Sequence, residues 1–272
     1  EFLRNELSNL LIYISMDLHL HQKKVLITGG SKGIGYACAE LFLEEGAEVI
    51  IVSSQSHSVE HALEKLQATY GQKITGHAVD LGAPDAQTRM AELLSDVDIL
   101  VNNAGAIPGG GLDAIDDEKW RKAWDLKVYG YINTVRDVLP KMMQRKSGVV
   151  INIIGMAGAS PSYDYICGSM ANASLITFTK AVGGHSSKSG VRVLGVNPGP
   201  TETDRLIKLY KERARYQLND ESKWRELLPN LPFGRPAKPE EIANLVVFLA
   251  SEKASYLSGL VIDADGGAMY AR

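Results

Sequence analysis

The chain has 272 residues, 45% of them hydrophobic and 22% charged, a balance typical of a folded soluble domain with a sizeable core. Its formal net charge of -3 argues against a general nucleic-acid binder. The cysteines, Cys38 and Cys167, lie far apart in the sequence and indicate neither a disulfide framework nor a zinc site. We expect a cytoplasmic protein that acts on a small molecule and holds no metal and no nucleic acid.

The first 15 residues contain one short apolar run, from Leu10 to Ile14. This run is too short to span a bilayer, which takes about 20 residues. The segment also lacks the small-residue cleavage pattern of a secretory signal. We expect residues 1–15 to be a leader added for expression or a disordered segment, with Met16 as the natural start and no membrane association.

Short β-branched runs alternate with helical patterns from Lys23 onward, and the runs are continuously apolar, as in strands covered on both faces. The alternation predicts an α/β fold with one doubly wound parallel sheet, forming a single domain over residues 16–272. Helices are predicted at 35–45 and 240–250, among others. The predicted strands are 25–28, 49–53, 74–79, 99–102, 149–154, 191–197 and 260–263.

One segment, about residues 202–230, interrupts this alternation. It is helical in composition and strongly charged, and we expect it to form a lid above the sheet. Its basic residues could attract a carboxylate or phosphate on the substrate. Because acidic residues are interleaved with them, we favour a solvated helix face. The basic residues are Arg205, Lys208, Lys211, Arg213 and Arg215.

The first predicted strand runs into "TGGSKGIG", residues 28–35. Gly29, Gly33 and Gly35 allow a sharp turn from strand to helix, so that backbone amides can approach a pyrophosphate at the positive helix end. A tight turn alone could also explain the glycines. Their position between a strand and a helix, about 20 residues before the end of the next strand, favours a dinucleotide site.

Four later motifs complete a resemblance that covers about residues 17–267. They are "VDL" at 79–81, "NNAG" at 102–105, "NPGPTET" at 197–203 and "DADGG" at 263–267. With the glycine turn, they resemble the short-chain dehydrogenase/reductase family of NAD(P)-binding, Rossmann-type oxidoreductases. The resemblance implies a seven-stranded sheet with helices on both faces, a small carbonyl or alcohol substrate, and a homodimer or homotetramer formed through segments such as 240–250 and 260–263.

The same resemblance implies which residues contact the cofactor. Ser53 and Ser54 stand where a carboxylate would repel a 2'-phosphate, and Lys32 adds a cation, so we expect NADP(H) to be preferred over NAD(H). A solvated Lys32 is the alternative. The full set of expected cofactor residues is Gly29, Ser31, Lys32, Gly33, Ile34, Gly35, Ser53, Ser54, Asp80, Leu81, Asn103, Ala104, Gly105, Asn172, Pro198, Gly199, Thr201 and Thr203.

The family's catalytic positions are all changed in this chain. The serine that orients the carbonyl, the tyrosine that donates the proton and the lysine that assists it correspond to Gly155, Gly168 and Asn172, and the family's asparagine corresponds to Lys127. The resemblance therefore implies an atypical member without the usual Ser/Tyr/Lys residues. Because lysine and asparagine have exchanged places, Lys127 could return an ammonium to the site from the opposite helix, although a chance exchange is equally open.

A replacement proton donor is available three residues before Gly168. Tyr165 would fill that role if it points into the cleft, where Lys127 would favour its phenolate. A tyrosine that merely caps the helix would look the same in sequence. Tyr163 lies in the same turn, and Cys167 is a weaker candidate because nothing nearby supplies a histidine base. We predict catalytic roles for Lys127 and Tyr165.

Three classes of function stay open on the sequence alone. They are an NADP-dependent oxidoreductase with a rearranged site, a non-redox lyase or isomerase that keeps the nicotinamide, and a catalytically silent cofactor sensor or structural protein. The substrate itself is not readable. We expect a mostly apolar cleft lined by Ile107, Pro108, Met156, Tyr163 and residues 206–210.

Overall fold

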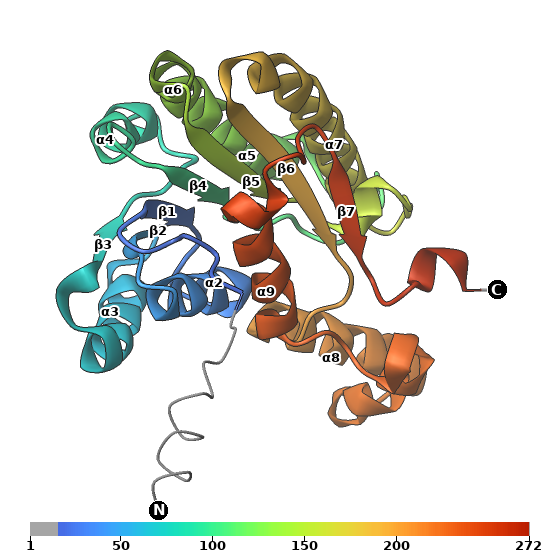
Figure 1. Ribbon diagram of the computed structural model, residues 1–272. Coiled ribbons are helices and arrows are strands. Elements are labelled where there is room, and N and C mark those ends of the chain that lie inside the picture. The colour runs from blue at the N-terminus through green and yellow to red at the C-terminus, as the bar shows by residue number, and fades with distance from the viewer. Residues whose placement is uncertain (1–15, 272) are drawn as a thin grey trace, which may run out of the picture.

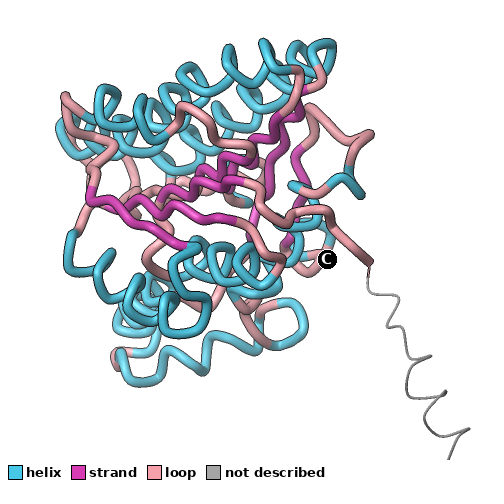
Figure 2. The backbone as a smooth tube through the Cα atoms, turned by 60° about the vertical axis from the view of Figure 1, so that its left-hand side comes forward, coloured by secondary structure: helices cyan, strands magenta, loops and turns pink. Residues whose placement is uncertain are grey.

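A computed structural model describes residues 16–271 as an α/β fold with one seven-stranded parallel sheet between two layers of helices (Figure 1, Figure 2). Residues 1–15, the expected leader, lie outside the described residues. The strands run in the order β3-β2-β1-β4-β5-β6-β7. Each predicted strand is confirmed to within one residue at either end. The strands are β1 (Lys24–Thr28), β2 (Glu48–Ser53), β3 (Ile74–Ala78), β4 (Ile99–Asn102), β5 (Gly148–Ile153), β6 (Val191–Pro198) and β7 (Val261–Ala264).

The helices form two layers, each with its own apolar core. Helices α2, α3 and α9 pack on one face of the sheet, and α4, α6 and α7 pack on the other. The predicted helices 35–45 and 240–250 are α2 and α9. Their bounds, with those of the other α-helices, are α2 (Gly33–Glu44), α3 (Ser56–Tyr70), α4 (Ala86–Leu93), α5 (Asp117–Trp124), α6 (Gly130–Arg145), α7 (Ile166–Ser186), α8 (Asp204–Leu218) and α9 (Pro239–Ala250).

The strand order reverses direction at β1, which pairs with β2 on one side and β4 on the other. Chain segments leaving the carboxyl ends of β1 and β4 therefore turn to opposite faces and leave a crevice between them, the usual place for a ligand in an open parallel sheet. The glycine turn after β1 and the "NNAG" segment after β4 meet at this point.

The edge strands differ from the expectation of cover on both faces. In β3, Ile74 is buried whereas Thr75 and His77 are exposed, and Asp263 in β7 is exposed as well. All four residues of the central strand β4 are buried. Continuous cover thus holds in the centre of the sheet and fails at its edges, where a strand has helices over only part of its surface.

A chain of buried polar groups crosses the middle of the sheet. Asn102 of β4 donates from Nδ2 to Oδ1 of Asn152 in β5 at 3.0 Å, and Asn152 donates in turn to Oγ1 of Thr179 in α7 at 2.9 Å. Thr134 of α6 donates to Oδ1 of Asn102 at 2.9 Å. Two strands and two helices are therefore joined by side-chain hydrogen bonds inside the core.

The segment expected as a lid forms α8 and a 3-10 stretch, Glu221–Asn230, beyond the carboxyl end of β6 (Figure 1). Thr203 caps α8 by accepting a hydrogen bond from the backbone N–H of Leu206 at 3.3 Å. The two helical pieces pack on one another around Tyr210 and Trp224, which are buried in a small cluster of their own. Within residues 16–271, no helix is both long enough and apolar enough to cross a membrane.

Candidate active site

The glycine turn between β1 and α2 is closely packed and has no room for side chains. Gly29 and Gly33 adopt positive φ angles of 68° and 55°. A Cβ on Gly35 would overlap the carbonyl oxygen of Gly29 and the side-chain amide of Asn103. Lys32, the N-cap residue of α2, makes no side-chain cap, so this helix end can offer backbone N–H groups to an anion. The turn fits the pyrophosphate of a dinucleotide.

Thr28 holds the glycine turn against the "NNAG" segment. Its Oγ1 accepts hydrogen bonds from the backbone N–H groups of Asn103 at 3.0 Å and Ala104 at 3.1 Å. The side chain of Asn103 donates back to the carbonyl oxygens of Thr28 and Gly29 at 3.1 and 3.0 Å. Sequence reasoning did not single out Thr28, although it is the first residue of the "TGG" motif.

Two of the serines expected near the adenine ribose lie together. Ser31 and Ser53, 22 residues apart in the chain, have their hydroxyl oxygens 2.9 Å from one another. Ser54 and Lys32 are exposed beside them in sequence. Hydroxyl groups at the end of β2 can donate to a phosphate, and the residue in the position of the usual carboxylate is uncharged.

The remaining expected cofactor residues follow β3 and β6. Asp80 is exposed and accepts a hydrogen bond from the N–H of Gly82 at 3.0 Å, whereas Leu81 is buried in a core. Thr201 donates to the carbonyl oxygen of Gly199 at 3.0 Å and forms a bridge with Ala237. The loop that would receive the nicotinamide is therefore fastened to the segment before α9.

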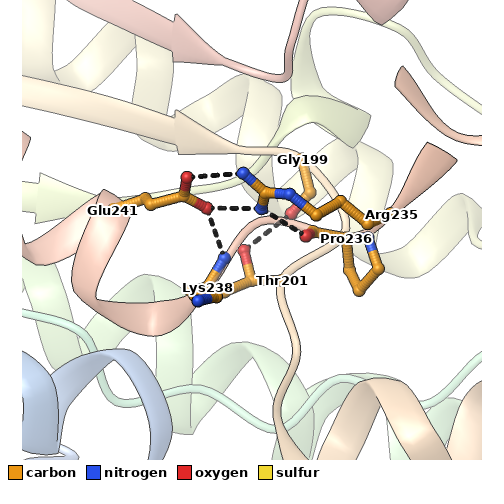
Figure 3. A network of polar contacts seen from close by, with 6 residues as sticks. All are labelled: Gly199, Thr201, Arg235, Pro236, Lys238 and Glu241. Atoms are coloured by element: carbon orange, nitrogen blue, oxygen red, sulfur yellow. Dashed lines mark hydrogen bonds and ion pairs between the residues drawn. The ribbon is translucent and has the colours of Figure 1, made fainter. Parts of the chain in front are cut away.

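A polar network holds that segment in place (Figure 3). Both guanidinium nitrogens of Arg235 donate to the carboxylate of Glu241 at 2.7 Å, and the backbone N–H of Lys238 donates to the same carboxylate at 2.7 Å. Hydrogen bonding from Arg235, then from the Lys238 backbone, lowers the pKa of Glu241 to about 2. These contacts fix the turn into α9 beside Gly199 and Thr201.

Lys127 lies in a π-helical turn, Asp125–Tyr129, between α5 and α6. Such turns are frequent at functional sites because the wider turn re-aims a side chain. Lys127 is only 7% exposed, and its Nζ donates to the carbonyl oxygen of Ile154 at 2.7 Å. Burial, and secondly the charge of Arg205, lower its pKa to about 7. Lys127 can therefore both hold and release a proton at neutral pH.

Asn172, which we expected at the position of the family's lysine, lies close to Lys127. Its Nδ2 donates to the carbonyl oxygen of Gly155 at 3.3 Å, so Lys127 and Asn172 bind the carbonyls of consecutive residues. Its Oδ1 is buried without a hydrogen-bond partner among residues 16–271. Gly155 has a φ of 129°, and a Cβ there would lie 3.0 Å from Nδ2 of Asn172.

Tyr165 occupies the space that Gly168 leaves open. It is the N-cap residue of α7 and is half-buried. A Cβ on Gly168 would overlap Cε1 and Cζ of the Tyr165 ring. The phenol thus stands where a side chain at position 168 would begin. Its Oη accepts a hydrogen bond from Arg205, so the cation in contact with it is Arg205, whereas we expected the nearby charge to come from Lys127.

The basic residues of the α8 segment are exposed where the structure describes their side chains, as expected of a solvated face, but Arg205 also binds a distant loop. It projects from the first turn of α8, and its guanidinium donates to the carbonyl oxygens of Gly105 at 3.1 Å and Ile107 at 2.9 Å. It also donates to Oη of Tyr165 at 2.9 Å. No feature of the sequence pairs Arg205 with a segment 100 residues away.

The expectation that residues 206–210 line the cleft is corrected in part. Leu206 and Tyr210 are buried in the cluster between α8 and 221–230, so they do not line the cleft. Tyr163 is 57% exposed and packs by Gly111. Burial raises the pKa of the Cys167 thiol, which disfavours a thiolate nucleophile.

Ile107 and Pro108, buried and half-buried, lie in the loop that Arg205 holds, and Met156 is half-buried after β5. A surface hollow of about 350 Å³ lies elsewhere, on α8 and the 3-10 stretch after it, lined by Asp204, Ile207, Lys208, Lys211, Arg215 and Glu221. Neither Lys127 nor Tyr165 lines this hollow.

Comparisons with known proteins agree with this geometry. A model of the short chain dehydrogenase family matches residues 23–214. The chain is 35% identical over 262 residues to the uncharacterized oxidoreductase YvrD of Bacillus subtilis, covering 93% of this chain and 98% of that protein. It is 32% identical over 256 residues to the 3-oxoacyl-acyl-carrier-protein reductase FabG of Chlamydia trachomatis, covering 91% of this chain and 98% of FabG.

Among solved structures, the chain resembles L-sorbose reductase from Gluconobacter frateurii, determined in complex with NADPH and L-sorbose. The TM-score is 0.87 at 32% identity, with 94% of this chain and 100% of the reductase covered. The strand order, the glycine turn and the relatives all indicate the same family. The chain belongs to the short chain dehydrogenase family of NAD(P)-dependent oxidoreductases.

Proposed function

We propose that the protein uses NADP(H), in preference to NAD(H), to interconvert a small carbonyl compound and its alcohol at a relocated proton-transfer site. The main observation behind this proposal is that the Tyr165 ring lies where a Cβ on Gly168 would be. The tyrosine that the family places at position 168 is absent, and a phenol from three residues earlier takes its place at the same end of α7.

The cofactor end of the site supports the preference for NADP(H). The packed glycine turn fits a pyrophosphate, and the hydroxyls of Ser31 and Ser53 stand where a 2'-phosphate would be held, with the Lys32 cation next in sequence. The sorbose reductase that this chain resembles was solved with NADPH. When bound, the nicotinamide supplies or accepts the hydride.

The proton is the part of the reaction that this chain's own side chains must handle. We assign the donor to Tyr165, which holds a proton at Oη, and a nearby cationic role to Lys127. The Lys127 stem packs against Gly105, where a Cβ would lie 2.9 Å from its Cδ, and Gly105 accepts a hydrogen bond from the arginine bound to Tyr165. Lys127 and Tyr165 are thus both linked to the loop after β4, Lys127 by packing and Tyr165 through Arg205.

A second candidate function follows from Gly155. This residue replaces the serine that orients the substrate carbonyl in the family, and a glycine has no side chain to take that role. A sensor, a lyase or an isomerase that binds the nicotinamide without redox turnover would not need a side chain to orient a carbonyl for hydride transfer.

Absorbance of the nicotinamide separates these functions. Purified protein would be mixed with NADPH and a panel of small ketones, keto sugars and 3-oxoacyl thioesters, while cofactor binding is measured by fluorescence titration. Turnover of NADPH that is lost in Tyr165→Phe supports the proposal. Binding without turnover favours a sensor, and conversion of substrate without net change in NADPH favours a lyase or isomerase.

We further infer a homo-oligomer of the cytoplasm. Strand β7 pairs only with β6 among the described strands, and Phe248 on α9 and Tyr256 after it are exposed, a combination that suits a contact between copies. Light scattering at micromolar concentration tests this assembly. A monomer would contradict it.

A further inference from the structure

We propose that Arg205 is a positioning residue for proton transfer, which holds the hydroxyl of Tyr165 and supplies the permanent positive charge beside it. This inference rests on the proposed function, in which Tyr165 is the proton donor. It adds a residue of α8 to the proton-transfer site and makes docking of α8 a condition for a complete site.

The guanidinium of Arg205 is held in place by its own hydrogen bonds. A guanidinium is planar and has five N–H donors in a fixed fork. In Arg205 two hydrogen bonds go to the backbone carbonyls of Gly105 and Ile107, and a third goes to Oη of Tyr165. The two backbone contacts fix the guanidinium independently of Tyr165. The tyrosine hydroxyl is therefore held by a donor that is already anchored.

Lys127 and Arg205 differ in their charge and in their contact with Tyr165. Lys127 is bound to the carbonyl of Ile154 and has a pKa lowered to about 7, so its charge is partly lost at neutral pH. A guanidinium group, by contrast, is not deprotonated in proteins. The cation in direct contact with Tyr165 is thus Arg205, and its charge is one cause of the lowered pKa of Lys127.

The chemical step explains why the contact matters. As the carbonyl carbon accepts a hydride, the O–H bond of Tyr165 breaks and its proton passes to the carbonyl oxygen. A phenolate remains at Tyr165 and regains a proton from water. The Arg205 N–H then donates to a charged oxygen, and such charge-assisted hydrogen bonds are roughly twice as strong as neutral ones. The stabilisation is therefore greatest when the proton has left.

A purely structural role is the competing explanation, since the same contacts would fasten α8 to the loop after β4. The two roles differ in what they change. A fastening residue affects the docking of α8 and substrate affinity, whereas a residue that stabilises the phenolate affects kcat and acts only through Tyr165.

The test uses the full chain with the substrate identified by NADPH turnover. Arg205→Ala should lower kcat at least tenfold with the dissociation constant of NADPH unchanged, and added guanidinium ion should restore part of the lost kcat. Arg205→Lys should retain more activity than Arg205→Ala. Lys208→Ala, an exposed basic residue one turn later on α8, is the matched control and should retain full kcat.

A double-mutant cycle then identifies the route of the effect. Arg205→Ala should cause little further loss in a Tyr165→Phe background, because the group it acts through is gone. Additive losses, or loss without rescue by guanidinium together with faster hydrogen exchange over residues 204–218, would overturn the inference in favour of fastening. An unchanged kcat in Arg205→Ala would overturn this inference and leave the proposed function standing. A parent protein without turnover would overturn both.

Discussion

The expected cofactor end and the proposed proton-transfer end of the site are built in different ways. At the cofactor end the backbone makes the site, since Gly29, Gly33 and Gly35 leave no room for side chains and Thr28 ties the two loops together. At the proton-transfer end side chains make it, and they come from separate elements. A requirement on the backbone can be met only where the chain makes its turn, whereas a side chain can reach one volume from several starting points.

Under the proposed function, this difference accounts for one end that resembles the family and another that departs from it. Glycine at position 168 would leave a tyrosine-sized space, and the chain fills that space with the residue three positions earlier. No neighbouring residue could replace Gly35 in the same manner, because the atoms that surround it are backbone and a packed amide. A substitution at one end should therefore alter the property of that end, kcat or cofactor affinity, and leave the property of the other end unchanged.

The largest effect is expected for removal of the proton donor. Tyr165→Phe should lower kcat by about 10²-fold or more, since loss of a positioned acid costs about 10²–10⁴-fold. The dissociation constant of NADPH should stay the same, because the glycine turn is untouched. Tyr163→Phe, two residues away and 57% exposed, is the control and should keep its activity. Equal activity in both variants would contradict the relocated donor.

The second effect concerns the pH dependence of stability. Burial lowers the pKa of Lys127 to about 7, below that of the unfolded chain, so between that pH and the ordinary lysine value the unfolded state binds more protons. The free energy of unfolding should therefore gain about 2 kcal/mol from this group between pH 7 and 9. Lys127→Met should lack that gain, whereas the exposed Lys122→Met should keep it.

Urea unfolding of the three proteins at both pH values measures this difference. Curves for Lys127→Met that shift with pH as much as those of the parent would show that burial does not lower the pKa of Lys127 in this way. The same variant should also lower kcat at least about tenfold, roughly 1.4 kcal/mol of barrier.

A smaller change is expected at the cofactor end. Ser53→Asp places a carboxylate beside the hydroxyl of Ser31, where it would repel a 2'-phosphate and accept from a ribose hydroxyl. The ratio of NADPH to NADH affinity should fall more than about tenfold, or about 1.4 kcal/mol. With saturating cofactor, kcat should stay near that of the parent. A ratio that does not move would place the 2'-phosphate away from β2.

A comparable change or less is expected when two glycines of α7 are compared. Gly168→Ala would push its Cβ into the Tyr165 ring and should lower kcat about tenfold, or about 1.4 kcal/mol, through the displaced phenol. Gly184→Ala meets nothing within 4 Å and should raise helix stability by up to about 1 kcal/mol with kcat unchanged. Similar activity in the two variants would mean that the contact between Gly168 and Tyr165 has no catalytic consequence.

The sequence predicts the fold well, and it makes the glycine turn visible, for a common reason. Buried β-branched runs and the glycine turn depend on neighbours in the chain, so their pattern is visible locally, and the strands agree to within one residue. The same local logic identified Gly168 as vacant and Tyr165 as the nearest phenol.

The sequence does not predict contacts that depend on how distant elements dock. Arg205 reaches Gly105 and Ile107 across 100 and 98 residues of chain, and its neighbours in α8 give no sign of that direction. Leu206 was expected in the cleft but is buried between α8 and 221–230, because that segment forms a small core of its own. The exposure of residues in β3 likewise depends on the position of this strand at the edge of the sheet. Hydrophobic periodicity alone does not predict the strand order.

The buried amide chain through Asn102 and Asn152 has a consequence for how the protein unfolds. Each amide is paired only when β4, β5, α6 and α7 are all in place. A partly folded state that keeps β1 to β4 and releases β5 would leave the Asn102 amide unpaired in the core, at a cost of about 1–3 kcal/mol. The two halves of the sheet are therefore bound into one cooperative unit, and we expect chemical denaturation to show a single transition by fluorescence and circular dichroism alike.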